Sequence, residues 1–83
     1  MKQLRAAVQS RKGLPNGYEY ELDMKRITLS EIAEWITMER LCCPFLAFQL
    51  DVKQDGATRL SMSGVNGTKA VLDEEFPIKS PHP

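Results

Sequence analysis

The chain has 83 residues and contains few side chains that bind metals tightly or attack as nucleophiles: one histidine, His82, and two adjacent cysteines, Cys42 and Cys43. A closed zinc site usually takes four ligands, so three such side chains are too few. The cysteines lack C-x-x-C spacing, which argues against thioredoxin-like redox chemistry. Because the histidine lies one residue from the end, no Ser/His/Asp or Cys/His pair can be assembled for nucleophilic catalysis.

An excess of one charge and long apolar runs are also missing. Lys and Arg number 11, and Asp and Glu number 11, whereas a nucleic-acid-binding protein needs a basic face for the phosphates. No apolar run approaches the roughly 18 residues of a membrane span. Residues 1–5 lack the apolar stretch of a signal peptide. We therefore expect a cytoplasmic protein that binds neither nucleic acid nor membrane.

The composition is that of an ordinary globular domain, with 42% hydrophobic and 27% charged residues. The length limits the chain to a single domain. We place this domain at residues 1–78 and expect a mobile, proline-rich tail at 79–83.

Turn and cap signals divide the chain into two similar halves. Alternating residues predict strands near 3–11 and 18–24, joined by a Pro-Asn-Gly turn at 15–17. A helix should begin at a capping box of Thr28 and Glu31 and end at Cys42 or Cys43, because Pro44 follows. Its predicted apolar stripe, continued by Cys43, comprises Leu29, Ile32, Ala33 and Ile36.

The second half repeats this order. It has strands at 45–52 and 58–63 around an Asp-Gly turn, then a helix near 66–75 whose acidic end opposes the helix dipole and must be held by packing. The order ββαββα predicts an α+β fold, a four-stranded, mainly antiparallel sheet with two helices on one face. Such a sheet leaves two edges and one face open, so we expect a partner, most simply in a homodimer.

Glu39, Cys42 and Cys43 form the one compact chemical feature of the sequence. Glu39 lies three residues before Cys42 and four before Cys43, so on a helix it neighbours both. A carboxylate beside a thiol can accept its proton. Adjacent cysteines close a strained disulfide ring, which a reducing cytosol disfavours further.

Metal binding by this group faces a geometric difficulty. Side chains at i and i+1 point about 100° apart on a helix, so chelation by both sulfurs needs local unwinding or a second chain. A soft, thiophilic ion of low coordination number, bound by Cys42 or Cys43 with Glu39 or a symmetry mate, fits these donors.

A purely structural role is the alternative interpretation of Cys42, Cys43 and Glu39. Cys43 continues the apolar stripe, and cysteine is among the most buried residue types. Cys42, on the flank near Trp35, fits a functional or a structural role. Glu39 would then pair with Arg40, Arg59 or a backbone N–H.

Three segments also carry a recurring pattern: ERLCCPFLAFQL at 39–50, LSMSG at 60–64 and GTK at 67–69. This pattern resembles that of a family of small, uncharacterised bacterial proteins with E-R-x-C-C-P-F-x-x-F, followed by L-x-x-x-G-x-x-G-x-K. The match spans residues 30–76. The resemblance implies a link to heavy-metal resistance and favours Glu39, Cys42 and Cys43 as a site.

We therefore predict a site at Cys42, Cys43 and Glu39 that binds a thiophilic metal ion or acts as a reactive thiol. The alternative, from a different class, is a non-catalytic dimerisation module with structural cysteines. An enzyme is the weakest interpretation, because no acid–base pair is evident beyond Glu39.

Overall fold

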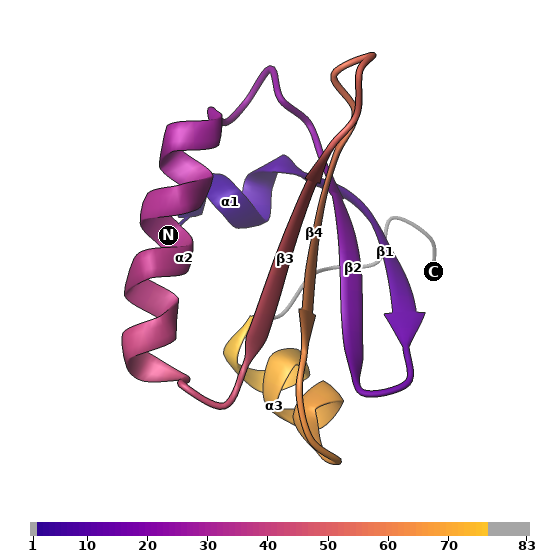
Figure 1. Cartoon of the computed structure of the whole chain (residues 1–83), viewed down its shortest axis with the longest axis vertical. Helices are drawn as coiled ribbons and strands as arrows, with labels where there is room; N and C mark the ends of the chain where they lie inside the picture. The colour runs from indigo at the N-terminus through magenta and orange to yellow at the C-terminus, as the bar shows by residue number, and fades with distance from the viewer. Residues whose placement is uncertain (1, 77–83) are drawn as a thin grey trace.

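The computed structural model describes residues 2–76. Its elements in chain order are α1 (Lys2–Ala7), β1 (Val8–Leu14), β2 (Gly17–Leu22), α2 (Leu29–Cys42), β3 (Ala47–Val52), β4 (Thr58–Ser63) and α3 (Thr68–Glu75) (Figure 1). The predictions for residues 77–83, the mobile tail included, lie outside the described residues.

The four strands form one open sheet in the order β1-β2-β4-β3, and every neighbouring pair is antiparallel. Two hairpins, β1–β2 and β3–β4, are thus joined through their second strands. The predicted α+β fold and its ββαββα order are confirmed, with α1 as an addition before the first strand.

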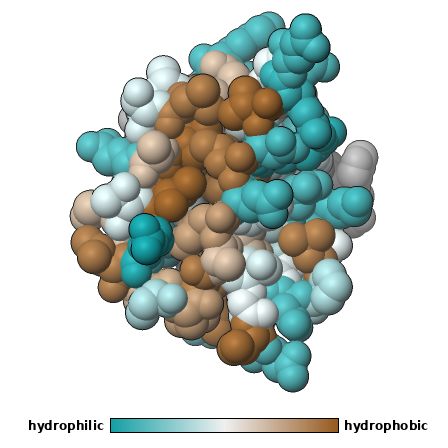
Figure 2. Space-filling view, in the orientation of Figure 1, coloured by the Kyte–Doolittle hydropathy of each residue, from teal (hydrophilic) through white to brown (hydrophobic). Residues whose placement is uncertain are grey.

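One face of the sheet forms the core and the other is polar. On the central strands the core side chains are Tyr18, Tyr20, Leu22, Thr58, Leu60 and Met62, and all are buried. Helix residues such as Ile32, Trp35 and Leu72 pack into the same cluster. In Figure 2 the apolar surface gathers between α2 and β3. Within residues 2–76, no helix has both the length and the apolar character that crossing a membrane requires.

The strand predicted at 3–11 is wrong over its first half, which forms α1. Leu4 and Ala7, three residues apart, are both fully buried, whereas Ala6 is exposed. This spacing is helical, and the residues of α1 are strong helix formers. The alternation of Leu4, Ala6 and Val8 was too short to distinguish the two periods.

The start of α2 follows its local signals. The backbone N–H of Glu31 donates to Thr28 Oγ1 at 3.1 Å, and the N–H of Thr28 donates to Glu31 Oε1 at 2.9 Å. The predicted capping box is therefore confirmed. Ile27 and Ile32, on either side of the cap, are both buried and fix the direction in which the chain enters the helix.

The buried stripe of α2 is rotated from the predicted one. Leu29 is 44% exposed and Ala33 is exposed, whereas Trp35 is only 4% exposed. Trp35 packs its ring against those of Phe48 and Phe76, at centroid distances of 6.2 and 5.3 Å, and these contacts turn the helix toward it.

Gly17 lets β2 and β4 approach closely. A Cβ at this position would collide with the carbonyl oxygen of Met62 on β4. Gly17 is the first residue of β2 and pairs with Ser63, so the β2–β4 ladder begins at this contact.

We expect Gly17→Ala to lower the free energy of unfolding by about 1–3 kcal/mol, because the backbone of β4 must shift to admit the methyl group. Urea denaturation measures the change. Gly13→Ala is the matched control on β1, since its Cβ would meet only the flexible end of Lys69 at 3.1 Å. Equal stability of the two variants would contradict the expected clash.

Candidate functional site

The predicted site residues lie where α2 ends. Cys42 is the last residue of the helix, and Cys43 caps it with φ −128° and ψ 70°, outside the helical region. The backbone N–H of Cys43 still donates to the carbonyl of Glu39 at 2.8 Å. Pro44 follows at once and prevents a further helical turn. The predicted helix end is confirmed.

Glu39 and Cys43 are in contact. The Sγ atom of Cys43 donates to Oε1 of Glu39 at 3.8 Å, within the range of a sulfur hydrogen bond. Cys43 is 8% exposed and Glu39 is half-buried. At about 100° per residue, Glu39 falls between the directions of Trp35 and Cys43, so its carboxylate occupies the core-facing side of α2.

Cys42 lies beside this pair but faces solvent. Its side chain therefore projects to a different side of the helix end from the buried side chain of Cys43. Neither cysteine forms a disulfide bond within residues 2–76. The structure therefore brings together two of the three predicted residues, Glu39 and Cys43, and leaves the third accessible next to them.

The cationic partners proposed for Glu39 from the sequence are wrong. Arg59 lies on the polar face of the sheet, away from α2, where it pairs with Glu21 at 4.0 Å. Arg40 is exposed, and within the described part of the chain Glu39 has no ion pair within 4.0 Å. The interaction observed for its carboxylate is with the Cys43 thiol.

Apolar side chains surround the end of α2. Met38, Leu41 and Phe45 are large apolar residues that remain exposed, Leu41 to 76%. Exposed apolar side chains and the exposed Arg40 thus adjoin Cys42 and the Glu39–Cys43 pair along the chain. Three or more His, Cys, Asp or Glu side chains do not form a group able to hold a metal ion anywhere in residues 2–76.

A second polar cluster, missed from the sequence, holds α3 against the sheet. Asp73 accepts hydrogen bonds from Arg11 Nη1 at 3.1 Å and from the Tyr18 hydroxyl at 3.0 Å. The Arg11 guanidinium lies 4.1 Å from the Tyr18 ring centre. Asp73 belongs to the acidic end of α3, which itself has no basic residue in its last turn. Arg11 therefore supplies the positive charge that the helix dipole favours at this terminus. The acidic end of α3, which is unfavourable to the helix dipole, is the sequence signal for such a cationic partner. From the sequence alone, we instead expect packing to compensate for it.

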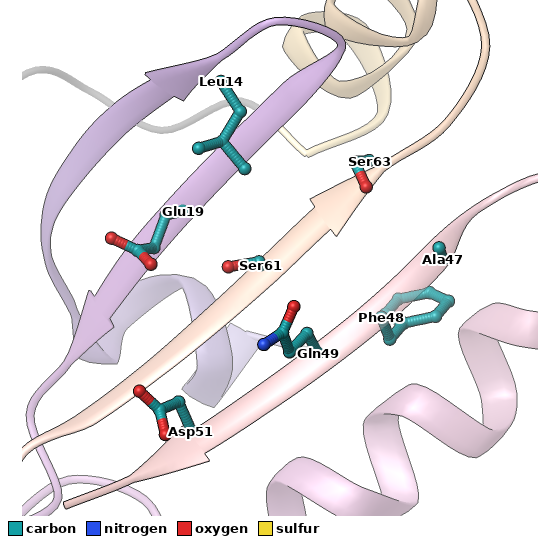
Figure 3. Close-up of a pocket in the computed structure, with 8 residues that line it drawn as sticks. All are labelled: Leu14, Glu19, Ala47, Phe48, Gln49, Asp51, Ser61 and Ser63. Carbon is teal, nitrogen blue, oxygen red and sulfur yellow. The ribbon is translucent and has the colours of Figure 1, made fainter.

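The open face of the sheet carries a shallow hollow of about 300 Å³ (Figure 3). Figure 3 shows its polar side chains rising from neighbouring strands, among them Glu19, Gln49, Asp51 and Ser61. An adjoining hollow of about 430 Å³ holds three cations and three carboxylates: Lys12, Lys53, Arg59, Glu19, Glu21 and Asp51. These opposite charges balance, so the face favours neither an anionic nor a cationic ligand.

Comparisons of the chain with protein-family models, with curated proteins and with solved structures found no match.

The two thiols should differ sharply in reactivity. In the native state we expect Cys42, measured alone in Cys43→Ser, to react at the rate of an unprotected thiol. Cys43, measured alone in Cys42→Ser, should react at least about tenfold more slowly, because its burial requires a local opening. A chromogenic disulfide reagent measures both rates, and urea should remove the difference. Equal rates in the native state would contradict the burial of Cys43.

The two tyrosines should respond oppositely to loss of their hydroxyls. The Tyr20 hydroxyl is buried without a hydrogen-bond partner among residues 2–76, so Tyr20→Phe should stabilise the protein by about 1 kcal/mol. Tyr18→Phe should destabilise it by a similar amount, because Asp73 loses a donor. Urea denaturation at pH 7 distinguishes these signs, and a loss of stability in Tyr20→Phe would contradict an unpartnered hydroxyl.

The dependence of stability on alkaline pH tests the burial of the Tyr18 and Tyr20 hydroxyls. Burial raises the pKa of Tyr20 well above the ordinary tyrosine value, and burial together with the bond to Asp73 raises that of Tyr18. A group whose pKa is raised by folding contributes stability that is present below its unfolded pKa and is lost as the pH rises toward its folded pKa. Stability should therefore fall above about pH 10, and phenolate absorbance should rise together with unfolding.

Proposed function

We propose that the end of α2 binds one soft, divalent metal ion through the sulfurs of Cys42 and Cys43, in the reducing cytoplasm. The observation that carries the proposal is the 3.8 Å contact between Cys43 Sγ and Glu39 Oε1, with exposed Cys42 adjacent. A reducing compartment keeps both sulfurs available as thiols. The resemblance to proteins linked with heavy-metal resistance supports the same chemistry.

The Glu39 carboxylate has a defined role in this proposal. A thiol must lose its proton to bind a metal ion. Cys43 is buried, so its proton cannot pass directly to water, but the Glu39 oxygen already accepts its S–H. Cys42 is exposed and releases its proton to solvent. Glu39 therefore acts as the proton acceptor for the inner of the two ligands.

The backbone at this point favours the rearrangement that chelation needs. Cys43 has already left the helical conformation, and Cys42 is the last helical residue. Helix ends fray easily, so rotation about one or two bonds at this terminus moves the Cys42 sulfur toward that of Cys43 without disturbing the rest of α2. Exposed Cys42 captures the ion first, and Cys43 completes the pair.

Charge favours a divalent ion. Two thiolates and one divalent cation form a neutral unit, which suits a surrounding of exposed apolar residues such as Leu41 and Phe45. Soft thiolate ligands select thiophilic ions, and Hg²⁺ prefers two sulfurs in a line. An oxygen-preferring ion such as Mg²⁺ does not match these donors.

Titration of the reduced protein with Hg²⁺, in the presence of excess small monothiol, tests the proposal. We expect the titration curve to break at one ion per chain. Near-ultraviolet thiolate absorption and the fluorescence of Trp35, the only tryptophan, both monitor binding, and the bound ion should quench that fluorescence. Cys42→Ser and Cys43→Ser should each lose the ion to the monothiol, because a single sulfur gives no chelate.

Two further variants serve as controls. Met38→Leu removes the neighbouring exposed thioether and should leave the titration unchanged. Glu39→Gln should keep one ion per chain but slow its capture, since the acceptor for the Cys43 proton is lost. The proposal fails if the wild type yields its ion to the monothiol as readily as either serine variant.

A further inference from the structure

The two edges of the sheet differ in a way that bears on self-association. The β1 edge carries a bulge between Val8 and Ser10, and the consecutive cations Arg11 and Lys12 lie on this strand. Bulges and charges of this kind discourage pairing with another strand. The β3 edge has an unbroken six-residue register with β4 and contains no proline. Of the two described edges, β3 lacks the bulge and the consecutive cations, and Asp51 is the one charged residue of this strand.

The register with β4 identifies which backbone groups of β3 face outward. The N–H of Lys53 donates to the carbonyl of Ala57 at 2.8 Å, so this pair is hydrogen-bonded across the hairpin. Bonding alternates along an antiparallel ladder, and therefore residues 47, 49 and 51 also bond toward β4. The N–H and C=O groups of Phe48, Leu50 and Val52 consequently point away from the sheet.

The side chains of these three residues are apolar and incompletely covered. Phe48 and Leu50 are half-buried, and Val52 is 47% exposed. Phe48 and Leu50 pack against the core cluster that includes Trp35 of α2, and strand alternation places Val52 on the same face. Figure 2 shows apolar surface between α2 and β3. The outward backbone groups and the partly covered apolar side chains therefore belong to the same residues.

We propose that β3 pairs antiparallel with β3 of a second copy of this chain, with Leu50 on the twofold axis. Leu50 then lies opposite the partner's Leu50, and Phe48 lies opposite the partner's Val52. All three outward-facing residues exchange hydrogen bonds across this interface. The two four-stranded sheets become one continuous sheet of eight strands.

The polar face supports the same register. Gln49 lies opposite the partner's Asp51, so an amide can donate to a carboxylate at two symmetric places. With the axis at Asp51, two carboxylates would oppose each other. With the axis at Gln49, Val52 would face the partner's Leu46, a residue outside β3 whose N–H is already bonded to Cys43. A one-residue slip would set apolar against polar side chains. Leu50 is thus the axis that complements both faces.

Sedimentation equilibrium of the full chain tests the proposal, with wild type expected to dimerise. Gln49→Glu should raise the dimer Kd at least about fivefold. In this variant the new carboxylate at position 49 faces the carboxylate of the partner's Asp51, and the twofold axis repeats this repulsion. Gln9→Glu is the matched control, the same exposed substitution on the β1 strand, and should change nothing. Combining Gln49→Glu with Asp51→Asn should restore the dimer, since the amide and carboxylate exchange positions.

Val52→Pro adds a backbone test. It removes an outward N–H and leaves the bonds between β3 and β4 intact, so the monomer should fold and fail to dimerise. Circular dichroism verifies folding, and the Gln49 series decides the matter if the proline variant unfolds. A wild type that stays monomeric up to about 1 mM, or a dimer insensitive to Gln49→Glu, would overturn the proposal. The cysteine variants should dimerise like wild type, which separates this result from metal binding.

Discussion

The pairing of β2 with β4 is the constraint on which the other contacts of the sheet depend. It joins the two hairpins through six residue pairs, from Gly17–Ser63 to Leu22–Thr58. Tyr20 and Leu60, directly opposite each other near the middle, are both fully buried. Because β2 and β4 hold the centre, β1 and β3 become the edges. The helix α2, which connects β2 to β3, must therefore cross from the centre of the sheet to an edge.

That crossing brings the end of α2 to the start of β3 and explains the position of Glu39. A carboxylate on the core-facing side of a helix costs free energy relative to an apolar residue. Its observed partner is a thiol, which is a weak hydrogen-bond donor and offsets little of that cost. Packing alone would favour leucine at this position. The Glu39–Cys43 contact therefore contributes little to the stability of the fold.

Local signals predicted most of the fold, and non-local contacts account for what they missed. The capping box at Thr28, the helix end before Pro44 and the bounds of β4 each depend on neighbouring residues. The contact of Glu39 with Cys43 followed from i, i+4 spacing. The partner of Asp73 is Arg11, 62 residues away, and no local pattern specifies it. Likewise, the side of the sheet on which Arg59 lies depends on the register between strands.

The two proposals concern separate parts of one surface. In the proposed dimer Ala47 lies opposite the partner's Lys53, so the two copies of Ala47 are six residues apart along the strand, or about 20 Å. The cysteines precede Ala47 by a short loop and thus lie at opposite ends of the shared interface. In this dimer one thiol pair would be too far from the other to supply a ligand to it, so each chain would bind the proposed ion alone. Self-association through β3 would therefore protect an apolar edge while leaving both thiol sites accessible.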